Sequence, residues 1–499
     1  MSPKADRILS GAFWGGVVNV VNAVYGFIAT PLLIAYFGKS DYGLIGLANS
    51  INSYLAIMDL GLSSTNVRFF SVWLAKGDEE KVNKLMGTCT AFYAVIGLVN
   101  AVVLLLLSLF SVYIFNLSIQ QNIIIKQILI ILACMSFINW YTSCYSQLIT
   151  ATENIAWVQK RTLLTKLLMI VVLFFTFTFK LSLIQFIIAT HCVTLVILPM
   201  TIGKARKEVP YVCLKARFDM STFKEVLPYT LSIFSFGIFQ YTFFQLRPVF
   251  LGIEGTTSDI TEYQVMNSLA GLAGMVSTVF MGALLPASSR IVSQGDRVNY
   301  YRVAYQGTKF ISICLCFCIF GLMSINKELL LVYVGEDFLH LVPWLNIWLF
   351  FLLGNHNQCI SSLILAGTDV KAISKISAFS SVLGLLICWF IIPFFHAGAL
   401  AISLGVYTTS QILFYWIYYW PQKMKISSRK VVLESLLPFV VLGSSITSGL
   451  SFFPSTRNHW LNILVIGFVF ALLFIIGAFF LLKKEDRHYL SALIRNKKK

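Results

Sequence analysis

The sequence predicts an all-α membrane protein with about fourteen transmembrane helices, and three observations support this fold class. Of the 499 residues, 58% are hydrophobic and only 12% are charged, and mean hydropathy is +0.79, whereas a soluble domain is roughly a quarter charged. The apolar runs reach about twenty residues, which suits a membrane helix and is twice the length of a barrel strand. The basic residues also alternate between the two membrane sides that these runs define.

Hydropathy in windows of about nineteen residues places the helices in order along the chain. A bilayer offers no water to backbone N–H and C=O groups, so each apolar run is expected to be helical. Short linkers near Lys180 and His396 separate two pairs of neighbouring runs. The predicted spans are 11–37, 43–74, 85–113, 123–150, 163–179, 181–202, 227–252, 263–289, 307–332, 341–365, 374–395, 398–420, 431–453 and 460–482.

The charge distribution predicts that both termini lie in the cytoplasm. With this orientation, 32 of the 38 Lys and Arg residues fall in cytoplasmic segments or at cytoplasmic helix ends. Adding or removing one helix would destroy the alternation, so the positive-inside rule supports both helix number and orientation. One basic residue, Arg247, is left inside a span, and the external side receives Lys39, Lys126, Lys180, Lys327 and Arg457.

An internal repeat divides the predicted helices. Similar residues recur 216–218 positions apart, each time joining one helix to the sixth helix after it: Pro31 with Pro248, Asn49 with Asn267, Gly77-Asp78 with Gly295-Asp296, Asn139 with Asn355, and Thr152-Glu153 with Thr368-Asp369. Six helices per repeat is an even number, so the two halves have the same orientation and are expected to enclose a central cavity. The predicted parts are an N-terminal half (1–203), a cytoplasmic linker (204–226), a C-terminal half (227–420), and two extra helices with a basic tail (421–499).

The net charge of +17 is mainly a consequence of topology. The charges are spread over many cytoplasmic segments and form no single stripe, so we expect no nucleic-acid partner. No G-x-x-x-x-G-K-[ST] or H-E-x-x-H motif occurs, no nucleophile and base are paired, and external loops are short. We therefore expect a transporter, not an enzyme, with no cofactor and no metal; its energy source is an ion gradient or a partner.

Polar residues gather on single faces of three predicted helices. In a bilayer such residues tend to face the bundle interior or a water-filled path, although small polar residues also mediate helix packing. Both interpretations stay open. The cavity candidates from these faces are Asn19, Asn22, Asn49, Asn52 and Asn267.

Three arginines are candidate cavity cations. Arg247 shares a helix face with Gln240, and its guanidinium suits a phosphate, which it binds by paired hydrogen bonds. Alternatively, Arg247 snorkels to the outer headgroups. Arg68 and Arg290 end helices on the cytoplasmic side, either as interfacial anchors or as a ring at the inner mouth of a cavity.

Three further ionisable residues are candidates for ion coupling. Asp59 lies in or near the second helix, where it either binds H⁺ or Na⁺ or serves as a helix-end residue. His191 and His356 lie within predicted spans, where a histidine is either buried and neutral or titrates during transport.

Residues 30–80 resemble the polysaccharide (O-antigen type) flippases of the multidrug/oligosaccharidyl-lipid/polysaccharide exporter superfamily. The resemblance rests on Tyr36-Phe37-Gly38-Lys39-Ser40-Asp41-Tyr42-Gly43, on Asp59-Leu60-Gly61-Leu62-Ser63-Ser64 with Arg68, and on the Gly77-Asp78 loop. The topology of twelve core helices and two appended helices resembles these flippases over essentially the whole chain.

This resemblance implies a function. Such proteins move an undecaprenyl-pyrophosphate-linked oligosaccharide across the inner membrane by alternating access, for O-antigen, capsule or exopolysaccharide biosynthesis. The implied partners are this lipid-linked substrate, H⁺ or Na⁺, membrane lipids, and a polysaccharide polymerase and glycosyltransferases of the same pathway. Two alternatives remain: a cation-coupled multidrug antiporter of the same superfamily, for which only Asp59 supplies a membrane-embedded acid, and a membrane enzyme such as a polymerase.

Overall fold

The computed structural model describes residues 3–213, 215–367, 370–453, 456–483 and 486. Over these residues the chain forms helices and no strands, which confirms the predicted all-α membrane fold class. The chain divides by packing into two compact units, Met1–Gln264 and Val265–Lys499, called unit 1 and unit 2 below. This grouping by packing differs from the sequence repeat, and the boundaries predicted from the repeat stay a prediction.

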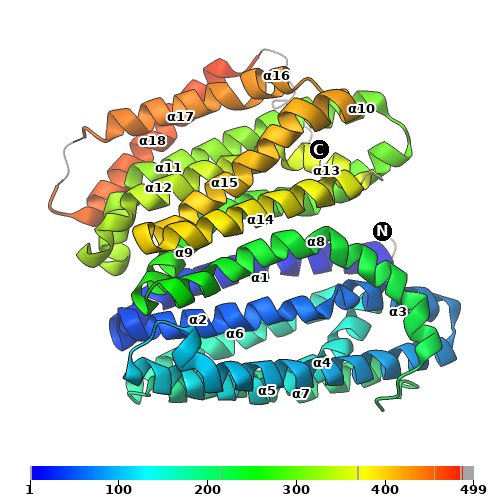
Figure 1. Cartoon of the computed structure of the whole chain (residues 1–499). Helices are drawn as coiled ribbons and strands as arrows, with labels where there is room; N and C mark the ends of the chain where they lie inside the picture. Colours follow the sequence, from blue (N-terminus) through cyan, green and yellow to red (C-terminus); the bar gives the residue numbers. More distant parts are fainter. Residues whose placement is uncertain (1–2, 214, 368–369, 454–455, 484–485, 487–499) are drawn as a thin grey trace. The chain divides into compact units, whose positions relative to one another are not determined.

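Unit 1 is a bundle of long helices (Figure 1). Helix α4 packs along α5, α1 along α6, α5 along α7, and α2 along α8. The bounds are α1 (Pro3–Phe37), α2 (Lys39–Leu55), the 3₁₀ turn η1 (Ala56–Asp59), α3 (Leu62–Lys76), α4 (Glu79–Ile114), α5 (Ile119–Ala151), α6 (Ile155–Thr178), α7 (Leu183–Glu208) and α8 (Met220–Glu254). Helix α9 (Thr257–Ser293) begins in unit 1 and continues into unit 2.

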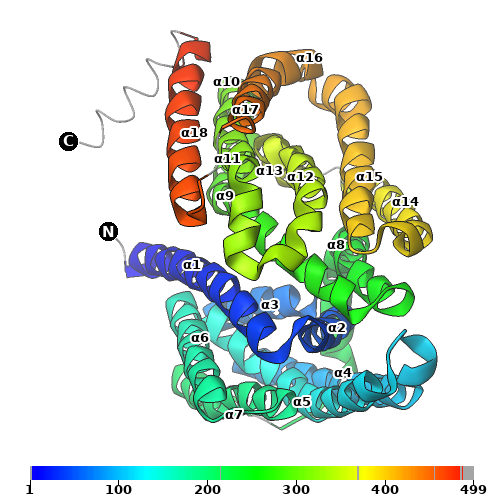
Figure 2. The ribbon, with the colours of Figure 1, turned by 90° about the vertical axis from the view of Figure 1, so that its left-hand side faces the viewer.

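Unit 2 packs α11 against both α17 and α18, and α14 against α15, as Figure 2 shows. Its helices are more often interrupted by 3₁₀ or π turns than those of unit 1. The bounds are α10 (Arg297–Arg302), η2 (Val303–Gly307), α11 (Thr308–Val334), η3 (Glu336–Leu341), α12 (Val342–Phe351), η4 (Leu352–Asn357), α13 (Gln358–Ala366), α14 (Val370–Phe395), α15 (Gly398–Phe414), η5 (Tyr415–Met424), α16 (Ser428–Lys430), η6 (Val431–Leu436), α17 (Leu437–Leu450) and α18 (His459–Leu481).

The outer surface of these helices is apolar. Large side chains such as Phe174, Phe390 and Phe468 are more than half exposed, which fits contact with lipid tails and not with water. Among the described residues, eleven helical segments are long and apolar enough to cross a membrane. The segments 39–76, 220–254 and 257–293 are not among the eleven. The protein is therefore a multi-pass membrane protein, while the number of fourteen spans and the cytoplasmic termini stay predictions.

The two Gly-Asp pairs of the repeat share local structure, whereas Asn139 lies in the α-helix α5 and its partner Asn355 in the 3₁₀ turn η4. Gly77 and Gly295 both have left-handed backbone, with φ of 68° and 63°, and glycine adopts this conformation without steric cost. Asp78 and Asp296 each cap the next helix by accepting a backbone hydrogen bond three residues on. Thr152 ends α5, whereas its partners Thr368 and Asp369 lie outside the described residues.

The linkers near Lys180 and His396 also share a conformation. These two residues, 216 positions apart, have φ of 52° and 48°, a region that non-glycine residues seldom adopt. Each separates two helices: α6 from α7, and α14 from α15. The predicted separation into two helices at each linker, instead of one long helix, is therefore confirmed at both positions.

Candidate functional site

A polar cavity of about 480 Å³ lies within unit 1, among α3, α5, α6 and α7. Hydroxyl and amide side chains dominate its lining. No acidic residue is among those that line it. The lining residues are Ser63, Asn139, Thr142, Ser143, Ser146, Gln147, Arg161, Thr162, Thr165, Lys166, Thr194, Ile197, Leu198 and Thr201.

Two half-buried cations of α6 give this cavity a positive charge. Arg161 donates from Nη1 to Ser146 Oγ at 2.6 Å and to Thr201 Oγ1 at 3.4 Å, which holds the guanidinium between α5 and α7. A guanidinium carries five N–H donors, so Nε and Nη2 keep three donors beyond the two that these bonds use. Lys166 lies five residues on, with Nζ 5.1 Å from the ring centroid of Tyr25 on α1.

A second polar cavity of about 400 Å³ adjoins the first. It shares Ser63, Ser146 and Gln147 with it and adds Ser64, Val67 and Thr150. The two cavities therefore form one polar region along the faces of α3 and α5, which is called the unit 1 cavity below.

A hydrogen-bonded network connects this cavity to Asp59. The carboxylate of Asp59 accepts from Ser63 Oγ and from Tyr93 Oη, both at 2.8 Å, and from the backbone N–H of Ser63 at 3.2 Å. Gln147 Nε2 donates to Tyr93 Oη at 2.8 Å and to Ser63 Oγ at 3.0 Å. Because Ser63 and Gln147 also line the cavity, Asp59 is one hydrogen bond away from its surface.

The local backbone explains why Asp59 accepts these bonds. Leu60 and Gly61 have φ of 54° and 83°, so the helical path breaks between η1 and α3. The first N–H groups of a new helix lack intrahelical partners, and the Asp59 carboxylate satisfies that of Ser63. Deeper in the unit, Asn66 Nδ2 donates to Gln147 Oε1 at 2.8 Å, and the thiol of Cys89 donates to Asn66 Oδ1 at 2.9 Å.

The predicted cavity residues do not converge on the unit 1 cavity. None of the twelve candidates is among its lining residues. Arg68 lies on α3 with its guanidinium carbon 4.0 Å from the ring centroid of Tyr229, which is the stacking expected of a cation on an aromatic face. Asn22 is half-buried, and the exposed candidates are Asn19, Asn49, Asn52, Gln240, Asn267 and Arg290. Their roles in binding stay predictions.

Arg247 is packed inside the protein in this conformation. Its side chain is 1% exposed, and its guanidinium carbon lies 4.4 Å from the ring centroid of Phe243 and 5.3 Å from that of Phe244. Both rings precede it on α8 by one turn, so part of its surroundings is set by its own helix.

The two candidate histidines have different surroundings. His356 is fully buried in η4, with Nδ1 2.8 Å from the carbonyl oxygen of Leu353, and its ring meets that of Trp416 edge to face at 5.8 Å. His191 is half-buried on α7. Neither lines the unit 1 cavity, and their titration during transport stays a prediction.

Sequence reasoning missed Arg161, Lys166, Tyr93 and Gln147. The predicted span 163–179 begins after Arg161 because the window excludes charged residues, whereas α6 begins at Ile155. A usable signal was present on two helices: Thr142, Ser146 and Thr150 recur every four residues on α5, and Thr162 and Thr165 lie three apart on α6, spacings that place each set on one face of its helix.

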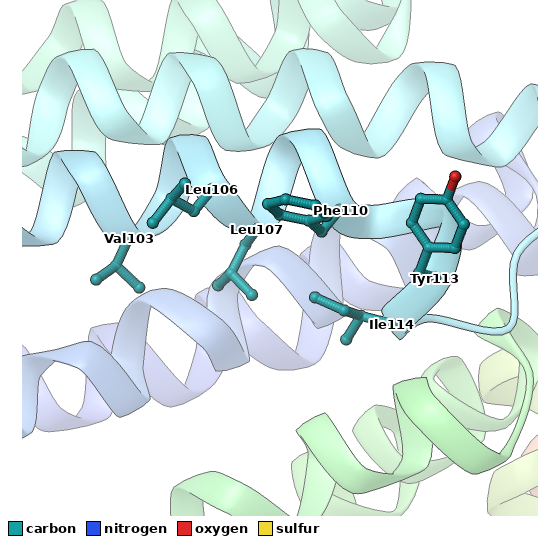
Figure 3. A pocket seen from close by; sticks show the side chains of 6 residues that line it. All are labelled: Val103, Leu106, Leu107, Phe110, Tyr113 and Ile114. Carbon is teal, nitrogen blue, oxygen red and sulfur yellow. The ribbon is translucent and has the colours of Figure 1, made fainter.

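A third cavity is apolar, unlike the two polar cavities of unit 1. It is an apolar groove of about 670 Å³ whose lining comes entirely from α4, with Tyr113 at its end (Figure 3). Leu106, Phe110 and Tyr113 in this groove are 48%, 52% and 86% exposed. Such a surface suits lipid tails, so we do not include it in the candidate site.

Known proteins match this chain over most of its length. A model of the family described as "Polysaccharide biosynthesis protein" matches residues 35–343. The membrane protein EpsK of Bacillus subtilis (strain 168) is 24% identical over 328 residues, and the match spans 63% of the length of each chain.

Solved structures show the same fold. A lipid II flippase MurJ in an inward closed conformation gives a TM-score of 0.71 at 13% identity, covering 92% of this chain and 97% of that one. An inward-facing multidrug resistance MATE family transporter of the MOP superfamily gives a TM-score of 0.63 at 13% identity, covering 88% and 96%. The resemblance seen in residues 30–80 is therefore confirmed, and the chain belongs to the polysaccharide biosynthesis protein family, with the fold of the flippases and transporters of this superfamily.

Proposed function

We propose that this protein flips a lipid-linked oligosaccharide from the inner to the outer leaflet of the cytoplasmic membrane by alternating access. The lipid we propose is undecaprenyl pyrophosphate, and the oligosaccharide is a repeat unit for a surface polysaccharide such as O-antigen, capsule or exopolysaccharide. A polymerase and glycosyltransferases of the same pathway are the proposed partners. The protein's own role is transport, not covalent chemistry.

The lining of the unit 1 cavity is the observation that carries this proposal. Hydroxyl and amide groups match the many hydroxyls of a sugar, and each such hydrogen bond contributes only about 0.5–1.5 kcal/mol net. Arg161 and Lys166 add positive charge, and a guanidinium pairs with phosphate oxygens through two parallel bonds. The absence of acidic residues from the lining disfavours an organic cation, which is the substrate class of the multidrug antiporter alternative.

Substitution of Arg161 tests this assignment. Reconstituted protein would be assayed with a fluorescent undecaprenyl-pyrophosphate oligosaccharide whose arrival in the opposite leaflet is measured by quenching. We expect Arg161→Ala to lower the transport rate roughly 10- to 100-fold, the effect of losing a charge-assisted hydrogen bond, and Arg161→Lys to lower it less. Lys160→Ala is the matched control, because Lys160 is the adjacent exposed cation and does not line the cavity. Equal rates for Arg161→Ala and wild type would exclude this cavity as the substrate site.

A deletion strain tests the pathway. We expect lipid-linked repeat units to accumulate on the cytoplasmic side and surface glycan to be lost. If units still reach the outer leaflet, and no second flippase substitutes, the flippase assignment fails. If ethidium efflux falls while surface glycan is unchanged, the multidrug antiporter alternative is favoured instead.

We also propose that Asp59 couples transport to an H⁺ or Na⁺ gradient. Protonation would remove one acceptor from the carboxylate that accepts from Ser63 and Tyr93. Both of these residues also accept from Gln147, which lines the cavity. Asp59→Asn keeps the size of the side chain and removes its charge. We expect transport by this variant to stop responding to an imposed H⁺ or Na⁺ gradient, whereas an unchanged response would reassign Asp59 to capping α3.

A further inference from the structure

Unit 2 contains a separate charged cavity of about 400 Å³ where the end of α9, the start of α10 and the end of η5 meet. It is called the basic cleft below. The positive-inside rule assigns these helix ends to the cytoplasmic side. The lining residues are Ile291, Val292, Gly295, Asp296, Arg297, Tyr300, Tyr301, Lys423, Met424 and Lys425.

Three cations of the basic cleft have no charged partner among the described residues. Arg297, Lys423 and Lys425 are exposed, and no ion pair within the described ranges includes them. Asp296 is the single acidic lining residue, and its carboxylate already accepts from the backbone N–H and from Nδ2 of Asn299, at 3.0 and 2.6 Å. The cleft therefore has an excess of positive charge.

The local backbone and two tyrosines shape the cleft. Lys425 has a left-handed backbone, with φ of 58°, and the next residue, Ile426, donates its backbone N–H to the carbonyl of Trp420 at 3.0 Å. This turn ends η5 and sets the positions of Lys423 and Lys425. The rings of Tyr300 and Tyr301 meet edge to face at 5.6 Å. Tyrosine is the side chain expected at headgroup depth, where one end of the ring is apolar and the other wet.

The repeat-related place in unit 1 is covered. There residues 211–213 and 215–219 lie on the start of α4: the backbone N–H of Cys213 donates to Asn83 Oδ1, that of Arg217 to the carbonyl of Gly87, and that of Asp219 to Thr88 Oγ1. In unit 2 only residues 425–427 connect η5 to α16. This connector is too short to cover the cleft.

We propose that the basic cleft binds the phosphate of an anionic phospholipid headgroup in the leaflet that faces the cytoplasm. Basic pockets between membrane helices on this side are suited to anionic headgroups. Arg297 supplies paired donors to phosphate oxygens, Lys423 and Lys425 supply point charges, and a tyrosine hydroxyl can donate to a further oxygen. This binding is independent of the transported substrate.

Native mass spectrometry of the purified full-length protein in detergent tests this site, with phosphatidylglycerol and phosphatidylcholine offered in equal amounts. We expect wild type to retain phosphatidylglycerol preferentially. Each cation near an anionic headgroup contributes about five-fold in affinity, so Arg297→Ala/Lys423→Ala/Lys425→Ala should bind it roughly a hundred-fold more weakly. The charge-preserving Arg297→Lys/Lys423→Arg/Lys425→Arg should retain most of it.

Two controls make the result decisive. Lys207→Ala/Lys215→Ala/Lys224→Ala removes the same charge from exposed lysines of unit 1 and should leave retention unchanged; an equal loss in this variant would overturn the proposal in favour of non-specific attraction. Equal retention of both lipids by wild type would also overturn it. In a further arm, inorganic phosphate alone is added, and complete displacement of phosphatidylglycerol at millimolar phosphate would reassign the cleft to soluble phosphates.

Discussion

The Gly77-Asp78 turn of unit 1 and the Gly295-Asp296 turn of unit 2 have the same local structure and different surroundings. In both, a left-handed glycine ends one helix and an aspartate caps the next. In unit 1 the helix that follows is covered by residues 211–213 and 215–219, whereas in unit 2 the turn lines an open, positively charged cleft. The repeat therefore preserves turns whose conformation depends on a few neighbouring residues. Whether such a turn is exposed depends on the length of a connector that comes later in the chain.

The interiors of the two units also differ. Unit 1 contains the buried polar network of Asn66, Tyr93 and Gln147 beside Asp59. Unit 2 contains an aromatic core around Tyr415, Tyr419 and Trp420, and its ion pairs lie toward the helix ends. One of these joins Lys309 to Asp486 at 2.7 Å with side chains 10% and 5% exposed.

The Lys309–Asp486 pair should show the largest effect. Lys309→Met leaves the Asp486 carboxylate buried without its partner, which costs about 3–5 kcal/mol, whereas Lys309→Met/Asp486→Leu should recover most of that loss. Thermal unfolding in detergent, followed by tryptophan fluorescence, measures both variants. If the single and double variants are equally destabilised, the pair does not stabilise unit 2 in the way proposed here.

Gln147→Leu should have the next largest effect, now in unit 1. It removes the partner of Asn66 Nδ2 and a donor to Tyr93 Oη, and a buried polar group left unsatisfied costs about 1–3 kcal/mol. Gln127→Leu is the matched control, because Gln127 is exposed on the same helix. The same unfolding assay compares them, and equal stability of the two variants would contradict a network that stabilises unit 1.

Removing the two repeat-related caps should have smaller, unequal effects. Asp78→Ala and Asp296→Ala each cost about 1 kcal/mol of cap stability. Hydrogen exchange in the first helical turn should rise more in α10 than in α4, because the bonds from Cys213, Arg217 and Asp219 to the following turns of α4 still hold that helix in the Asp78→Ala variant. A larger rise in α4 would show that the covering segment adds no local stability.

The smallest effect concerns pH at the covering segment. The backbone N–H and hydroxyl of Thr222 hold the pKa of Asp219 below its ordinary value of 3.8. A lowered pKa means that this contribution to stability is present above the ordinary pKa and is lost as pH falls through the lowered one. Between about pH 6 and pH 3, the unfolding midpoint of wild type should therefore fall slightly more than that of Asp219→Asn. Identical pH profiles would show that the bond from Thr222 does not depend on charge.

Much of the fold could be predicted from the sequence because its signals are local. Apolar runs define helices in a bilayer whatever packs against them, since each helix satisfies its own backbone. The Gly77-Asp78 and Gly295-Asp296 turns, and the breaks at Lys180 and His396, depend only on residues within about one helical turn. The family resemblance in residues 30–80 is of the same kind, because a motif carries its own backbone conformation.

The site could be predicted only in part, because it depends on how helices are rotated and paired. Helical projection shows that Ser146 and Gln147 lie near a polar face, but not that this face meets Arg161 and Thr201 from two other helices. The hydropathy windows likewise placed Arg161 outside its helix, because hydropathy cannot show that side chains of α5 and α7 bond to Arg161. Those partners make its partial burial possible. By itself the sequence determined the all-α class, most of the long helices and several of the turns between them, but not every helix end: α6 begins at Ile155, and the predicted span 43–74 is broken between α2 and α3. The tertiary structure alone decided which polar groups share a cavity, because those groups are far apart in the chain and only the packing of neighbouring helices brings them within hydrogen-bonding distance.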